Sequence, residues 1–177
     1  MGGNVNALVL LSNDHRAVEE LFNRLSSAKP VNRDDTIDRL ILELSVHAEV
    51  EEEIVYPAIK RHVEGGRRLA NQAERDHREM KDKLERLADM DPDSREAEAL
   101  IEELHQDVQE HFGEEEGPDG LFAQLRASMD EESLKELAPQ ITEARISRTV
   151  KNPTPEDDDA KAPPPKDVGG RTFIQQP

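Results

Sequence analysis

The chain contains no cysteine and no tryptophan, and aromatic residues make up only 3% of its 177 positions. Without cysteine the protein can form no disulfide, and any metal that it binds has to be held by nitrogen and oxygen atoms. Because aromatic residues are so scarce, a hydrophobic core has to be built mainly from Leu, Val, Ile and Ala. The length predicts a domain that buries a core of several helices.

Positive charge is also in short supply, since 23 Lys and Arg stand against 40 Asp and Glu, for a formal net charge of −17. Nucleic acids and anionic membrane surfaces attract basic faces, so we expect neither as a partner. No apolar run approaches the length of a membrane span, and the N-terminus lacks the layout of a signal peptide. These absences predict a cytoplasmic protein.

What the sequence does contain is helical periodicity. Apolar residues recur three and four positions apart, which is the spacing of the contact seam between packed helices. Four segments show this spacing, approximately residues 5–27, 34–62, 67–88 and 94–116. Because the connections between them are short, consecutive helices are expected to be antiparallel. The prediction is an all-α fold with an up-down-up-down four-helix bundle.

Three features predict local breaks in these helices. Residues 91–93 offer a cap and a helix-start proline for the fourth segment. Pro57 removes a backbone hydrogen bond inside the second segment and predicts a kink just beyond Glu51. Gly113 weakens the fourth segment.

Two shorter amphipathic pieces follow the bundle, and Asp130, a residue type that favours the N-cap position, precedes the second. We expect these short C-terminal helices to cover one end or flank of the bundle. From about Arg148 onward the chain is acidic, rich in proline and nearly devoid of apolar residues, which predicts disorder. The predicted organisation is therefore a metal-binding domain over residues 1–146 and a disordered acidic tail over 147–177.

Polar residues interrupt the apolar seam of every helix. His47-x-x-x-Glu51 and His111-x-x-x-Glu115 each place an imidazole and a carboxylate one turn apart, where the repeat calls for Leu or Val. A buried charge without a partner is costly to desolvate, and residues four apart on a helix share a face, so each pair can chelate a cation. With one histidine from each remaining seam, the candidate metal ligands are His15, His47, Glu51, His77, His111 and Glu115.

This set predicts a site for two metal ions. Six nitrogen and oxygen ligands are too many for one tetrahedral zinc ion, whereas they suit two ions that share bridging carboxylates. Two divalent ions would also neutralise the buried Glu charges. A lone histidine in an apolar seam is usually a hydrogen-bonded core residue, but four of them with two glutamates favour the metal site.

The remaining candidates fit such a site less well. His62 lies about three turns, roughly 16 Å, beyond the ligand pair of the second helix, and His105 lies at the edge of its seam. Tyr56 is expected to pack in the bundle, with a role as a phenolate ligand or as a hydrogen-bond partner of the ligands as the lesser alternative. Residues 74–77 and 102–105 fit the Glu-x-x-His element of ferritin-like diiron bundles. That arrangement would direct apolar residues of the fourth helix away from the core, and it would need a long crossover connection where the connections are short, so we reject it.

In this order the motifs resemble the hemerythrin-like superfamily, and more closely its bacterial HHE cation-binding branch. The similar stretches are residues 13–22, 46–58, 76–79 and 111–116, and the resemblance covers about residues 6–125. It implies a non-haem diiron centre, oxo- or hydroxo-bridged, inside the bundle. Carried over by position, the ligands form one pair for each iron and one bridging pair: His15 with His47, His77 with His111, and Glu51 with Glu115.

The chain departs from the oxygen-carrying members of this superfamily at one position. Those proteins hold one iron with an extra histidine, four residues after the ligand of the third helix, and here that residue is Lys81. The iron at His77 is then expected to keep an open or water-filled position unless Lys81, Glu74 or Tyr56 fills it. This departure argues against reversible oxygen carriage.

The sequence is compatible with three functions. The first is a diiron protein that binds or senses dioxygen, nitric oxide or iron, as a monomer or weak homodimer. The second is a diiron enzyme that consumes peroxide or oxidises iron, because catalytic metal sites keep open positions. The third is a metal-free helical interaction protein whose acidic tail is the contact.

Overall fold

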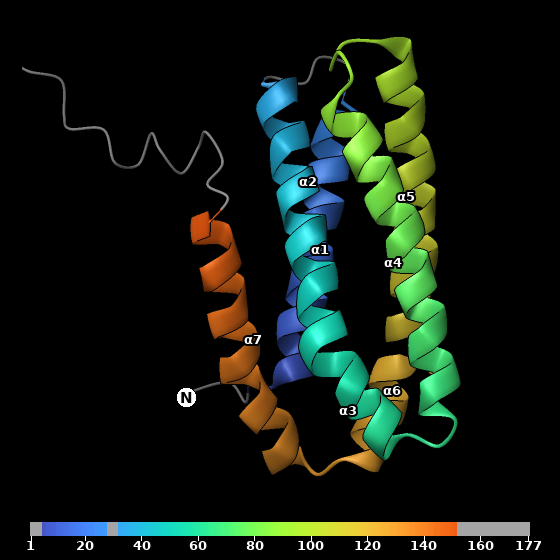
Figure 1. The fold of residues 1–177 in the computed structure, drawn as a ribbon, viewed down its shortest axis with the longest axis vertical. Helices are drawn as coiled ribbons and strands as arrows, with labels where there is room; N and C mark the ends of the chain where they lie inside the picture. The colour runs from blue at the N-terminus through green and yellow to red at the C-terminus, as the bar shows by residue number, and fades with distance from the viewer. Residues whose placement is uncertain (1–4, 28–31, 152–177) are drawn as a thin grey trace, which may run out of the picture.

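The computed structural model describes residues 5–27 and 32–151, and it confirms the all-α four-helix bundle (Figure 1). No strand occurs within these two ranges. The bundle consists of α1 (Ala7–Leu25), α2 (Arg33–Val50) with its continuation, α4 (Gly66–Ala88) and α5 (Arg95–Glu116). The helices succeed one another as antiparallel neighbours, and α1 also contacts α5, which closes the bundle.

The second predicted helix is interrupted by a π-helical segment, η1 (Glu51–Val55), and continues as α3 (Tyr56–His62). Pro57 explains the interruption, because it has no N–H to donate and its ring would clash with the carbonyl four residues earlier. The Tyr56 N–H bonds to the Glu51 carbonyl, five residues back, instead of four. The break predicted beyond Glu51 is therefore a widened turn of the π type.

Polar side chains cap the N-termini of several helices, and one of the predicted caps was wrong. The Asn6 side chain accepts the Val9 N–H at the start of α1, and Asp130 accepts the Ser133 N–H before α7. The prediction that residues 91–93 cap the fourth helix was wrong, because the N-cap is Ser94, whose hydroxyl accepts the Ala97 N–H at 3.1 Å. Gly113 does not interrupt α5, which runs on to Glu116.

Two further helices cover the bundle. The short helix α6 (Leu121–Ser128) packs at the end formed by α3 and α5, and α7 (Glu131–Lys151) lies along α1 and α2 (Figure 1). The expectation of short helices holds for α6 and is wrong for α7, which has 21 residues. It continues past Arg148 because that side chain pairs with Glu49 and Glu53 on the second helix. The rest of the predicted disordered tail, residues 152–177, lies outside the described residues.

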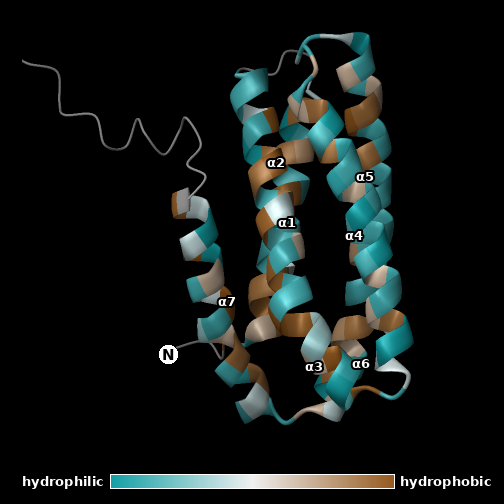
Figure 2. Ribbon diagram, viewed as in Figure 1, coloured by the Kyte–Doolittle hydropathy of each residue, from teal (hydrophilic) through white to brown (hydrophobic). Residues whose placement is uncertain are grey.

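The buried core is divided into two apolar clusters. One lies near α3, α6 and the start of α1, and the other lies where α1 ends and α5 begins. In α1, His15 falls between Leu11 of the first cluster and Val18 of the second. Figure 2 shows hydrophilic residues along the outward surfaces of the bundle. The described helices include none that is both long and apolar enough to cross a membrane.

Candidate metal centre

The structure brings the six predicted ligands together between the two apolar clusters. None of them is more than 3% exposed, although all are ionisable. They come from all four bundle helices and their π continuation: His15, His47, Glu51, His77, His111 and Glu115. Such burial is costly unless the groups are paired or hold a cation.

The ligand atoms form two overlapping groups. In the first, His15, His47, Glu51 and Glu115 place one atom each within 4.8 Å of one another, and in the second Glu51 does so with His77 and His111. These groups match the division of histidines that the resemblance implies. Their use as metal ligands remains a prediction.

The two carboxylates lie between histidines of both groups. A Glu51 oxygen lies 3.3 Å from Nε2 of His47 and 3.4 Å from Nε2 of His77. Glu115 approaches Nε2 of His15 at 3.3 Å with one oxygen and Nε2 of His111 at 3.7 Å with the other. Each carboxylate therefore lies between imidazoles of the two ligand groups.

Several buried nitrogen and oxygen atoms of the candidate ligands have no hydrogen-bond partner in this arrangement. Within the described residues they include Nε2 of His15, both ring nitrogens of His47, Oε1 of Glu51 and Oε2 of Glu115. Nε2 of His77 and Nε2 of His111 lie only 3.0 Å apart. Buried donor and acceptor atoms are normally satisfied, so convergent lone pairs of this kind fit metal ions held by imidazole and carboxylate.

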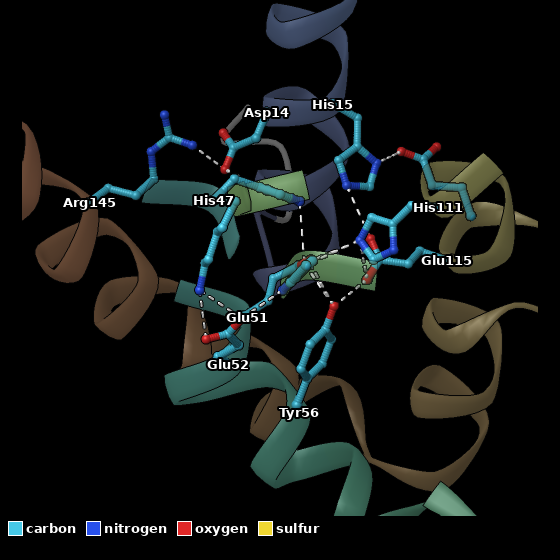
Figure 3. A network of polar contacts seen from close by, with 12 residues as sticks. Asp14, His15, His47, Glu51, Glu52, Tyr56, His111, Glu115 and Arg145 are labelled. Carbon is cyan, nitrogen blue, oxygen red and sulfur yellow. Dashed lines mark hydrogen bonds and ion pairs between the residues drawn. The ribbon is translucent and has the colours of Figure 1, made fainter. Parts of the chain in front are cut away.

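Tyr56 lies in the middle of this cluster. Its hydroxyl oxygen lies 3.2 Å from an oxygen of Glu51 and 3.2 Å from one of Glu115 (Figure 3). It also lies 3.1 Å from Nε2 of His77. In a regular α-helix a residue five positions on lies about 140° around the axis. The π segment adds a residue to the turn and brings Tyr56 beneath Glu51. Tyr56 packs in the core as expected, and its hydroxyl contacts favour the lesser alternative of a role among the ligands as well, for which Pro57 was the available signal.

The other two candidates for the open position point elsewhere. Lys81 Nζ lies 2.9 Å from both oxygens of Glu52, and Glu74 pairs with Lys60 at 2.5 Å. Neither belongs to the two ligand groups. Of the three residues considered for that position, Tyr56 alone places its polar atom among the ligands.

Carboxylates behind the imidazoles orient two of the rings. Nδ1 of His15 lies 2.5 Å from Glu116, and Nδ1 of His77 lies 3.1 Å from Glu52. His15 also stacks on Phe112 with the ring centroids 3.7 Å apart. Such outer contacts fix the ring that a metal ligand presents and raise its basicity. Glu52, Glu116 and Phe112 were not predicted as site residues, because nothing in the sequence pattern distinguishes them from their neighbours.

A third carboxylate connects the centre to α7. Asp14 lies 3.9 Å from Nδ1 of His47 and is paired with Arg145 (Figure 3). Arg145 also bonds to Glu43 at 2.9 Å. The C-terminal helix therefore reaches to within one residue of a candidate ligand.

The remaining histidines lie outside the centre, as expected. His105 bonds to Glu19 at 3.0 Å and stacks on Phe22, and His62 is exposed. Glu102, which the ferritin-like alternative would use, is exposed as well.

The environment shifts the acid–base behaviour of the buried groups. Burial alone would lower the pKa of His77, but its hydrogen bonds to Glu51 and Glu52 and the carboxylate charges outweigh burial and raise the pKa to about 9. For Glu115, burial favours the neutral acid, yet His111 and His15 together lower its pKa to about 2. The carboxylate is therefore ionised at neutral pH and available to a cation.

Two other groups are held neutral. Burial lowers the pKa of His111, so the ring keeps a lone pair at neutral pH. Burial, together with the charges of Glu51 and Glu115, raises the pKa of the Tyr56 phenol far above its usual value. Tyr56 would bind as a phenolate only where a metal ion replaces its proton.

Comparisons with known proteins agree with this geometry. The family model described as the hemerythrin HHE cation binding domain matches residues 6–125. An uncharacterized hemerythrin-like protein of Schizosaccharomyces pombe is 30% identical over 126 residues, covering 68% of this chain and 60% of that protein. A protein named DNA nickase from a Nostoc species is 27% identical over 133 residues, covering 75% of this chain and 37% of that protein. The chain thus spans less than two thirds of the length of either relative.

A solved structure shares the fold. It is the crystal structure of a hemerythrin HHE cation binding domain-containing protein from Mycobacterium kansasii, with a TM-score of 0.70 and 23% sequence identity. The match covers 83% of this chain and 89% of the other.

Proposed function

The chain belongs to the hemerythrin HHE cation-binding domain family, and from this premise we propose that it holds a non-haem pair of iron ions and binds or senses a small molecule there. The observation that carries the proposal is the convergence of four buried imidazoles on two shared carboxylates. His15 and His47 would hold one ion, His77 and His111 the other, with Glu51 and Glu115 between them. Bound iron would supply redox chemistry and coordination positions for dioxygen or nitric oxide.

A small neutral molecule would reach the centre beside the start of α6. A cavity of about 450 Å³ beside the start of α6 reaches both His111 and Glu115. Leu69, Ala73 and Leu121 contribute apolar surface to it. An uncharged diatomic molecule can cross such a surface without losing strong hydration, so this cavity suits dioxygen or nitric oxide.

Metal content measured together with near-ultraviolet and visible absorption tests the proposal. We expect about two iron ions per chain and the absorption of an oxo- or hydroxo-bridged ferric pair in the aerobic protein. His47→Ala should lose metal, whereas the matched variant His105→Ala, outside the centre, should keep it. Near-zero iron and zinc in freshly purified protein would instead favour the metal-free interaction protein.

A second function is favoured by the contact between Lys81 and Glu52, which keeps Lys81 away from the ligand groups. With no histidine at that position, the ion at His77 would keep a place for a reacting molecule unless Tyr56 fills it. That arrangement suits an enzyme that consumes peroxide or oxidises iron. Oxygen evolution from added peroxide, lost in Glu51→Ala, would support the enzyme. A stable and reversible oxygenated spectrum would support the binding protein.

A further inference from the structure

A second and smaller cavity, of about 160 Å³, lies between α4 and α5 and also reaches the candidate metal centre. Its lining is dominated by carboxylates: Asp76 and Glu79 from α4, and Asp107, Glu110 and Glu114 from α5. Gln72, Met80 and His111 complete the lining, so no Lys or Arg contributes to it. We call this cavity the acidic vestibule.

Most of the negative charge in the acidic vestibule is not neutralised by ion pairs. Asp107 pairs with Lys83 at 2.5 Å, and Asp76 accepts a hydrogen bond from the Gln72 amide at 2.8 Å. Glu79, Glu110 and Glu114 have no ion pair with any other residue in the described ranges. Like charges gathered in a concave surface focus the electric field and attract ions of the opposite sign.

An unpartnered buried side chain forms part of the lining. His111 is 3% exposed, and its Nδ1 is buried without a hydrogen-bond partner. The other nitrogen of the ring, Nε2, lies 3.0 Å from Nε2 of His77, inside the centre. One imidazole thus links the lining of the acidic vestibule to the other candidate ligands, and its Nδ1 has no partner among the described residues.

The neighbouring apolar cavity differs in chemistry although the two share Gln72, His111 and Glu114. Arg68 lines the apolar cavity, and its carboxylates are fewer relative to its size. A hydrated cation is therefore attracted to the acidic vestibule, whereas the apolar cavity suits a neutral molecule.

We propose that the acidic vestibule is an entry site for divalent cations, with ferrous iron as the cargo, and that it loads the metal centre. This inference rests on the proposed function, because the cation has to have a destination. Carboxylate oxygens can replace the waters of a hydrated ferrous ion one at a time before the ion reaches the nitrogen ligands. The site would accelerate loading without being part of the final ligand set.

The test is the rate of metal uptake by the metal-free full chain under anaerobic conditions. Cobalt(II) serves as the probe, because it is stable to oxidation and its visible absorption changes when it binds nitrogen and oxygen ligands. The variant Glu79→Gln/Glu110→Gln/Glu114→Gln removes three charges from the acidic vestibule. The matched control Asp82→Asn/Glu85→Gln/Glu102→Gln removes three charges from exposed positions on the same two helices.

We expect the association rate at low ionic strength to fall about tenfold in the vestibule variant and less than about twofold in the control. High salt should remove most of the difference, because it screens exposed charges. The number of ions bound at equilibrium, and the rate at which the iron-loaded protein binds nitric oxide, should be unchanged in both variants. Should the triple variant fold poorly by circular dichroism, Glu110→Gln alone should still slow uptake about twofold.

Equal association rates in the vestibule variant and the control would overturn the inference. That result is distinct from failure of the proposed function, which would appear as wild-type protein that takes up neither cobalt nor iron. Uptake of two ions by wild type with no effect of the vestibule charges would refute only the entry site.

Discussion

Glu51 and Glu115 are fully buried, and each faces imidazoles from both ligand groups. The charges of two such carboxylates are tolerable in an apolar interior only with cationic partners. In the metal-free chain the pKa values of His15 and His77 are both raised by these carboxylates, so both rings hold a proton more tightly than a free imidazole and supply part of that compensation. Metal ions would take over the same role once bound.

The variant Tyr56→Phe should show whether Tyr56 is a metal ligand or only a packing residue. Removing the hydroxyl takes away a close donor shared by Glu51 and Glu115, so we expect a loss of about 1–3 kcal/mol in the free energy of unfolding of metal-free protein. If Tyr56 binds ferric iron as a phenolate, the variant also loses a visible charge-transfer band while the iron content is kept. Glu74→Gln, which changes a residue outside the ligand groups, should leave the spectrum unaltered. An identical spectrum in Tyr56→Phe would show that the phenol is not a ligand.

The raised pKa of His77 predicts how stability depends on pH. Its folded pKa of about 9 exceeds the ordinary value of 6.5, so its stabilising contribution is complete below pH 6.5 and is lost as pH rises through 9. Glu115, with a pKa lowered from 4.5 to about 2, contributes above pH 4.5 and loses its contribution as pH falls through 2. Both contributions are complete between pH 4.5 and pH 6.5. Urea unfolding of metal-free protein should therefore show the greatest stability in this range.

Metal loading should change the alkaline side of that profile. Imidazole binds a metal only when it is deprotonated, so uptake near neutral pH should release the proton of His77. Calorimetry in two buffers of different ionisation enthalpy would measure this release. The stabilisation by metal should then grow between pH 6.5 and 9, and a stabilisation that shrinks over this range would contradict the assigned protonation state.

At the scale of elements, the π segment and α7 have the largest effect on the surroundings of the centre. The segment η1 moves Tyr56 onto the face of Glu51, and α7 brings Arg145 to Asp14, behind His47. Helix α7 lies beyond the residues that the family model matches. Its contact with the centre is therefore supplied by a part of the chain outside the matched domain.

Arg145→Gln should loosen α7. The side chain pairs with Asp14 and Glu43, which are 14% and 13% exposed, so we expect a loss of about 1–2 kcal/mol in the free energy of unfolding and faster amide exchange along α7. Arg148→Gln is the matched control, since its partners Glu49 and Glu53 are at least half exposed. Surface pairs of that kind contribute less than about 1 kcal/mol. Equal losses in the two variants would show that the contact with Asp14 adds no stability.

At the scale of the whole molecule, a layer of ionisable groups separates two apolar clusters. Each cluster can pack by itself, but the layer joins them only when its charges are satisfied. Occupation of the centre and cohesion of the bundle are therefore expected to be linked.

Removal of metal should lower thermal stability in a concentration-dependent manner. A ligand present at about a thousand times its Kd stabilises the folded state by about 4 kcal/mol, which corresponds to a shift of roughly 10 °C in Tm for a chain of this length. Calorimetry before and after chelation would measure the shift. His47→Ala should show little further loss on chelation, and an unchanged Tm in chelated wild type would argue against a structural role of the metal.

The sequence alone was sufficient for the four bundle helices and for the six polar residues that meet between them. Helical periodicity is a local property, and it predicts which residues face the interior before any contact between helices is known. Residues such as His15 and His77 stood out because they occupy positions where the repeat calls for apolar side chains.

Only the tertiary structure decided what surrounds those six residues. The place of Tyr56 depends on a π turn that Pro57 permits but does not require, and the length of α7 depends on carboxylates some hundred residues earlier in the chain. The acidic vestibule likewise joins α4 and α5 side chains whose meeting depends on how the two helices are rotated against each other. Such features are set by packing between distant segments, which the periodicity of one segment does not contain.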